Sequence, residues 1–147
     1  MDRRMNKLVV SLMLPPIIGL IAAIASLLEQ PGGGSVCDIN SFISCSQVIY
    51  SRYSSFMGIS LSIWAALYFT TAILIATTYL AVKKQTAMKI YWGISIAALP
   101  IIAILIYIEI LVIKALCLYC TVMHISIITM SVVSTTYTAR LGHNKSL

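Results

Sequence analysis

Four cysteines in two pairs are the residues of this chain best suited to chemistry. Cys37 and Cys45 are separated by seven residues, and Cys117 and Cys120 form a C-x-x-C motif. Thiolates exchange with disulfides, so two such pairs on one chain could relay electrons. Paired cysteines can also hold zinc, but a zinc ribbon normally combines two C-x-x-C motifs, and the first pair here is C-x7-C. We therefore predict a thiol–disulfide relay and no metal site.

Composition indicates the elements that must position these cysteines. The chain has 147 residues, of which 60% are hydrophobic and 10% are charged, whereas soluble domains carry about 25% charged residues. Four segments reach the roughly 20 apolar residues that a spanning helix needs. Lipid offers no partner to unpaired backbone amides, so each span must be helical. The sequence predicts an all-α membrane protein, a single-domain bundle of four transmembrane helices over about 8–28, 57–81, 90–113 and 116–138, with an outer loop over 29–56.

Basic residues are distributed unevenly around these spans. Of the ten Lys and Arg residues, eight precede the first span, lie between the second and third, or follow the fourth. Four crossings place those eight on one side, and only Arg52 and Lys114 on the other. By the positive-inside rule, both termini are cytoplasmic and all four cysteines lie outside the cytoplasm, where disulfides persist. The charge thus predicts a multi-pass cell-membrane protein in contact with the bilayer, and no basic stripe suggests nucleic acid.

The N-terminal segment also resembles a cleavable signal peptide, because Ala23-Ile24-Ala25 follows a basic start and an apolar run. The apolar run continues to Leu28, which is longer than a usual signal core, so we treat the segment as a span. Pro15-Pro16 should kink its helix or delay its regular start. A face of small residues should permit close helix packing; it comprises Gly19, Ala22, Ala23 and Ser26. The glycines at 32–34 predict a hinge after it.

The fourth span carries a polar face, which in a membrane helix points to the bundle interior or to a cavity. At about 100° per residue, its members are Cys117, Cys120, Thr121, His124, Ser131 and Thr135. We expect Ser131 and Thr135 to make hydrogen bonds between helices. His124, one turn below Cys120, is either a ligand contact or a core histidine bonded to a carbonyl. At the start of the third span, Tyr91-Trp92 should lie at the membrane interface.

The two cysteine pairs differ in geometry. Residues three apart on a helix have Cβ atoms about 5–6 Å apart, and a disulfide needs about 3.5–4.5 Å. A Cys117–Cys120 bond therefore needs local adjustment, and strained, exposed disulfides are the labile, catalytic ones. The helix start favours a thiolate there, and Lys114 adds to this. A bond between Cys37 and Cys45 would close a small ring that suits a mobile carrier better than a structural staple.

The residues around both pairs resemble the vitamin K epoxide reductase family. Residues 37–48 (CDINSFISCSQV) are similar to the family's loop signature, and residues 117–121 (CLYCT) to its C-x-x-C. Ser51 stands where the family carries Ser or Thr, and residues 56–59 (FMGI) resemble the start of its second span. The resemblance covers about residues 8–138.

The resemblance implies a sequence of electron transfers. A thioredoxin-fold partner outside the cytoplasm, similar to DsbA, is oxidised by Cys37 and Cys45. Cys45 then passes the electrons to Cys117 through a mixed disulfide, which reduces the Cys117–Cys120 disulfide. Finally, Cys120 reduces a bound quinone. All four cysteines are thus the expected catalytic residues.

Four residues are expected at the quinone: Cys120, His124, Ser51 and Phe56, of which the family places the last two at the pocket mouth. The sequence departs from the family at two positions. Leu61 stands near the place where many members have Asn, and His124 stands where vertebrate enzymes have Tyr. Both departures favour a plain respiratory quinone (ubiquinone, menaquinone or a vitamin K type) in a prokaryotic-type member functionally similar to DsbB.

Two alternatives remain at the level of sequence. The enzyme could reduce vitamin K epoxide itself, or the chain could be a non-catalytic membrane scaffold with structural disulfides. A scaffold explains two outer cysteine pairs but not a C-x-x-C at a helix mouth above a polar stripe. We therefore predict a quinone-dependent thiol–disulfide oxidoreductase that supports disulfide bond formation.

Overall fold

The computed structural model describes residues 3–29 and 37–143 of the chain. In this part, four helices are long and apolar enough to cross a membrane, over Lys7–Leu28, Leu61–Val82, Gln85–Ile113 and Leu118–Arg140. The elements are α1 (Arg3–Leu28), α2 (Cys45–Ile49), β1 (Ser55–Phe56), β2 (Ile59–Ser60), α3 (Leu61–Val82), α4 (Gln85–Tyr107), the π-helix η1 (Ile108–Ile113) and α5 (Leu118–His143). The predicted all-α bundle of four membrane helices is confirmed.

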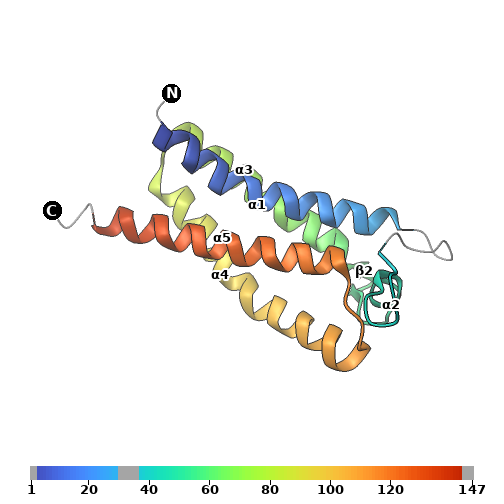
Figure 1. The fold of residues 1–147 in the computed structure, drawn as a ribbon. Coiled ribbons are helices and arrows are strands. Elements are labelled where there is room, and N and C mark those ends of the chain that lie inside the picture. The colour runs from blue at the N-terminus through green and yellow to red at the C-terminus, as the bar shows by residue number, and fades with distance from the viewer. Residues whose placement is uncertain (1–2, 30–36, 144–147) are drawn as a thin grey trace.

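The bundle places its polar connections at opposite ends (Figure 1). Helix α1 begins and α5 ends at one end, where α3 and α4 are joined by only Lys83 and Lys84. The opposite end carries α2, the β1–β2 hairpin and the link from η1 to α5. Both cysteine pairs belong to this second end, as the four-crossing topology requires.

The second span begins later than predicted because a hairpin precedes it. Ser55 pairs with Ser60 and Phe56 pairs with Ile59 in a two-stranded antiparallel ladder. The turn between them holds Met57 and Gly58 at φ 55° and 79°, a left-handed conformation that glycine adopts without strain. Helix α3 therefore starts at Leu61 and not at residue 57. Helix α4 conversely starts at Gln85, five residues before the predicted 90.

One local prediction about an aromatic residue is corrected, and one of the two expected effects of the proline pair, a delayed helix start, is excluded. Helix α1 runs through Pro15 and Pro16 as one helix from Arg3, so the prolines do not delay its start. Tyr91 is 1% exposed and donates a hydrogen bond of 3.1 Å to the carbonyl of Leu12. Tyr91 therefore lies in the core of the bundle, where it joins α4 to α1, and is not a residue of the membrane interface. The predicted hinge at 32–34 lies outside the described residues.

The small-residue face of α1 is a packing surface, as predicted. Ala22, Ala23 and Ser26 are buried, and the Ser26 hydroxyl pairs with that of Ser62 on α3 at 2.8 Å. A Cβ on Gly19 would overlap the ring of Phe69 on α3, which is itself fully buried. Glycine thus allows the α1 backbone to approach α3 at this level.

Replacing Gly19 with alanine is expected to destabilise the bundle by about 1–3 kcal/mol, because the added Cβ would overlap the buried Phe69 ring and force the ring or the helix to shift. The measurement is denaturant unfolding of the purified protein in detergent. Gly93→Ala is the matched control, since a Cβ at Gly93 in α4 meets nothing within 4 Å. Equal stability of the two variants would contradict the packing argument.

Candidate redox site

The outer loop is attached by its backbone to the segment that precedes the C-x-x-C motif. Ile43 and Leu116 form a parallel bridge. The Leu116 amide donates to the carbonyl of Phe42 at 2.7 Å, and the Ser44 amide donates to the carbonyl of Leu116 at 3.1 Å. This backbone clamp, formed by residues 42–44 and 116, brings the residues that follow each partner, Cys45 and Cys117, to the same place.

A short helix then fixes the position of Cys45. Ser44 is the N-cap of α2, and its hydroxyl accepts a hydrogen bond from the amide of Gln47 at 3.4 Å. The Asp38 carboxylate accepts bonds from the hydroxyls of Ser44 at 2.9 Å and Ser46 at 2.5 Å, and from the amide of Ser46 at 3.1 Å. Because Cys45 is the first residue of α2, these contacts hold its sulfur in place.

Three sulfur atoms meet at this point. Cys37 and Cys45 form a disulfide with their Cα atoms 5.7 Å apart, and the thiol of Cys117 lies 3.2 Å from the sulfur of Cys45. Cys45 and Cys117 are both fully buried, and Cys37 is 5% exposed. The three sulfurs lie within 4.8 Å of one another, but the disulfide ties up two of them, whereas a metal needs free thiolates. The arrangement is suited to thiol–disulfide exchange between Cys117 and Cys45.

Cys117 lies immediately before α5, where its sulfur faces the first turn of the helix. The backbone amide of Cys120 lies 3.5 Å from that sulfur. Hydrogen bonding from Cys120 lowers the pKa of Cys117, and the burial of the thiol and the charge of Glu109 oppose this effect. A sulfur with a lowered pKa leaves a disulfide more readily, so the lowered pKa of Cys117 favours its release from a mixed disulfide with Cys45.

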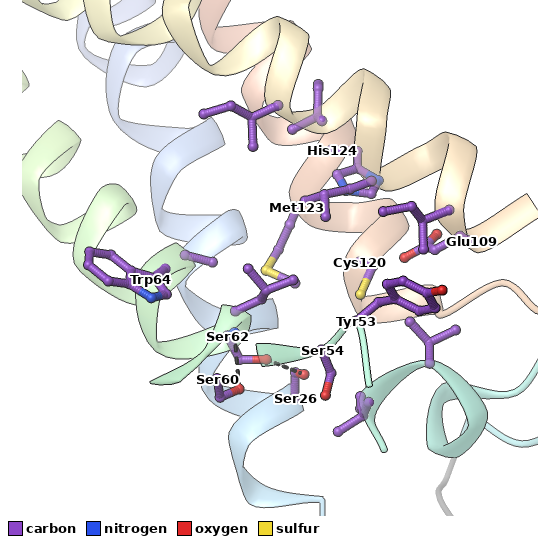
Figure 2. A pocket seen from close by; sticks show the side chains of 18 of the residues that line it. Ser26, Tyr53, Ser54, Ser60, Ser62, Trp64, Glu109, Cys120, Met123 and His124 are labelled. Carbon is purple, nitrogen blue, oxygen red and sulfur yellow. Dashed lines mark hydrogen bonds between the residues drawn. The ribbon is translucent and has the colours of Figure 1, made fainter. Parts of the chain in front are cut away.

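A cavity of about 240 Å³ lies directly behind the C-x-x-C motif. Apolar side chains from α3, α4, η1 and α5 form most of its wall, and Val48 and Ile49 of α2 and Tyr53 of the outer loop add to it. Figure 2 shows Cys120, His124 and Glu109 along one wall and a group of serines along another. Cys120 therefore contacts Cys117 on one side and the cavity on the other.

The structure brings three of the four predicted quinone contacts to this cavity: Cys120, His124 and Ser51. His124 is 7% exposed and, among the described residues, makes no hydrogen bond to a carbonyl; its ring faces the cavity (Figure 2). Phe56 is not among the lining side chains, because the β1–β2 hairpin leaves it 60% exposed.

Two polar residues further along α5, Ser131 and Thr135, join helices, as predicted. The Ser131 hydroxyl donates to the carbonyl of Ser95 on α4 at 3.0 Å. The indole of Trp92 on α4 donates to the Thr135 hydroxyl at 3.0 Å. The polar face of α5 is thus divided: its outer half faces the cavity and its inner half packs against α4.

Sequence reasoning missed two groups that line the cavity. The first is Glu109, which is 4% exposed and is the one buried residue of η1. An acidic residue in an apolar span was an available signal, since such residues in membranes usually have a function. The second is the Ser26–Ser62 pair, whose hydroxyls are joined at 2.8 Å across α1 and α3. No spacing rule connects residues 36 positions apart, so this pair had no signal in the sequence.

Comparison with known proteins agrees with this geometry. A search of curated proteins gave no match. The family model described as the vitamin K epoxide reductase family matches residues 10–135, which include both cysteine pairs and at least part of each of the four spanning helices. The chain belongs to the vitamin K epoxide reductase family, whose members are membrane redox enzymes.

Proposed function

We propose that this membrane oxidoreductase passes electrons from a thioredoxin-fold protein to a quinone, and so supports disulfide bond formation in a manner similar to DsbB. The observation that carries the proposal is the 3.2 Å separation of the Cys117 and Cys45 sulfurs, with Cys120 lining the cavity behind them. In this route Cys37 and Cys45 exchange with the partner, and Cys117 and Cys120 exchange with the loop pair. Cys120 is the residue next to the acceptor.

The residues around the cavity fit a quinone ring. Ligand sites are mostly apolar, with a few placed polar groups, and this one has serine hydroxyls on one side and Cys120 with His124 on the other. Its volume of about 240 Å³ is below the roughly 300–1,000 Å³ of sites that enclose a whole drug-sized ligand. A ring head group would therefore occupy it while an isoprenoid tail stays in lipid. A bound quinone supplies a two-electron acceptor.

Charge and potential support the direction of transfer. Lys83 and Lys84 lie at the end of the bundle where α1 begins and α5 ends, opposite the cysteines. The positive-inside rule then places the cysteine end outside the cytoplasm, where reduced secretory partners are found. DsbA-like oxidants have potentials near −120 mV, so their reoxidation needs an acceptor near or above that value, which an oxidised quinone provides.

The direct test is oxidation of a reduced thioredoxin-fold protein by the purified enzyme, with and without added quinone. We expect turnover only with quinone, and loss of turnover in each of four single Cys→Ala variants. Parallel assays with ubiquinone, menaquinone and vitamin K epoxide distinguish the acceptor. Oxidation without added quinone would refute the quinone as acceptor, and four variants with wild-type rates would leave only a structural role for the disulfides.

A further inference from the structure

The buried acidic residue of the cavity wall, Glu109, has no part in the electron route described above. Only four acidic residues occur in the chain, and Glu109 is the one within the four spanning segments. No Lys or Arg among the described residues forms an ion pair with it. An ionisable residue at membrane depth is costly to keep and is usually functional.

A change from α-helix to π-helix determines the position of the Glu109 carboxylate. Helix α4 continues into the π-helix η1, in which Glu109 is buried while Ile110, Leu111 and Val112 are exposed. The Glu109 carbonyl accepts bonds from the amides of Lys114 and Ala115, the latter at 3.2 Å. The chain therefore turns back directly after η1 toward Cys117. Single π-turns are rare and often occur at functional sites.

The groups that face the carboxylate are few. From α5 they are Cys120 and His124, which line the same cavity wall (Figure 2). From the outer loop the facing group is Tyr53, and from the link to α5 it is Cys117, on whose thiol the charge of Glu109 acts. None of these groups is a fixed cation. A carboxylate in this position is able to take up a proton from a neighbouring thiol.

We propose that Glu109 accepts the proton of the Cys120 thiol and returns it to the ring oxygen of the quinone, a role that deepens the function proposed above and rests on it. When the dithiol is oxidised, the S–H bond of Cys120 breaks and an O–H bond forms on Glu109. The electron pair leaves through Cys120 to the ring, and a Cys117–Cys120 disulfide forms. The carboxyl proton then moves to the ring, so one proton of the two-electron reduction is carried by Glu109 and the second comes from the Cys117 thiol.

The first test uses near-isosteric variants in single-turnover quinone reduction by the prereduced enzyme. Glu109→Gln keeps the shape but cannot carry a proton, and we expect its rate to fall about 100-fold, in the range typical of proton-transfer residues. Its rate should also lose the pH dependence of the wild-type enzyme. Glu109→Asp should regain part of the rate and the pH profile. Glu29→Gln is the matched control, because Glu29 is an acid at the same end that accepts the Tyr119 hydroxyl at 3.0 Å and is not a cavity residue.

The second test needs no quinone. The infrared difference spectrum between the disulfide and dithiol states of Cys117–Cys120 should contain a carboxyl signal that disappears in Glu109→Gln. A signal unchanged in that variant, or a Glu109→Gln rate within threefold of wild type, would overturn the inference. If the wild-type enzyme fails to reduce quinones, the proposed function fails, and the infrared signal alone then decides whether Glu109 exchanges a proton with Cys120. Retained exchange between Cys117 and Cys45 verifies that each variant is folded.

Discussion

Replacing Cys120 with alanine should abolish quinone reduction, with a loss of at least about 1,000-fold, the scale observed when a reacting nucleophile is removed. The reason is geometric: Cys120 is the one cysteine that lines the cavity, whereas Cys117 is fully buried against the loop disulfide. Without Cys120, electrons that reach Cys117 have no sulfur that contacts the acceptor. The measurement is the rate of quinone reduction by prereduced enzyme in detergent or nanodiscs.

Binding of quinone should survive this change, and the chain offers an internal probe. Trp64 lines the cavity, and the only other tryptophan, Trp92, is hydrogen bonded to Thr135 away from it. In a Trp92→Phe background, quenching of Trp64 fluorescence reports quinone affinity with and without Cys120. Ser126→Ala is the control for turnover, because Ser126 is buried in the same helix and its hydroxyl donates to the carbonyl of Val122 in that helix. Wild-type turnover in Cys120→Ala would refute the electron route.

A stable Cys45–Cys117 disulfide is the second large effect expected. The double variant Cys37→Ala/Cys120→Ala keeps only the two cysteines whose sulfurs lie 3.2 Å apart. Each normal resolving thiol is then absent, so mild oxidation should convert most of the protein to the mixed disulfide. Mass spectrometry of the cross-linked peptides identifies the Cys45–Cys117 bond. Loss of the cross-link after addition of a reductant is the control that it is a disulfide.

The backbone clamp can be tested in the same double variant. Leu116→Pro removes the amide that donates to Phe42 at 2.7 Å, and loss of one such bond, worth about 1 kcal/mol, should lower the equilibrium yield about fivefold under a thiol buffer. Leu118→Pro is matched to it, because Leu118 is the first residue of α5, a position where proline is tolerated. Cross-linking that is absent in the double variant itself would mean that the two cysteine pairs do not communicate.

The sequence was sufficient to predict the helices because lipid leaves few choices. Apolar length alone identifies segments that must form helices, and the small residues of α1 indicated its packing face. The boundaries were less predictable where local pairing competes with helix formation. Residues 55–60 are as apolar as a helix start, but the left-handed Met57 and Gly58 turn the chain into a hairpin. Tyr91 was misplaced because an aromatic residue near a span end can face either the interface or, as here, a buried carbonyl.

The site was predictable to the extent that it follows from chemistry written in short motifs. The cysteine spacings pointed to two redox pairs, and one helical turn related Cys120 to His124. The two cysteine pairs are brought together by a bridge between residues 43 and 116. Side-chain patterns do not encode this bridge, because it is formed by the backbone. The position of Glu109 depends on a π-turn, and the period of 3.6 residues per turn on which a helical wheel is drawn does not hold through such a turn.

The loop that carries Cys45 also forms the outer wall of the cavity, through Val48, Ile49 and Tyr53. A molecule bound in the cavity therefore contacts that loop, and any outward motion of the loop must weaken its binding. Thermodynamic linkage makes the effect mutual. The closed loop raises the affinity of the cavity for its ligand by the same factor by which the bound ligand raises the equilibrium constant for loop closure. An inhibitor that fills this space would consequently slow delivery of reducing equivalents from the aqueous side as well as their removal into lipid.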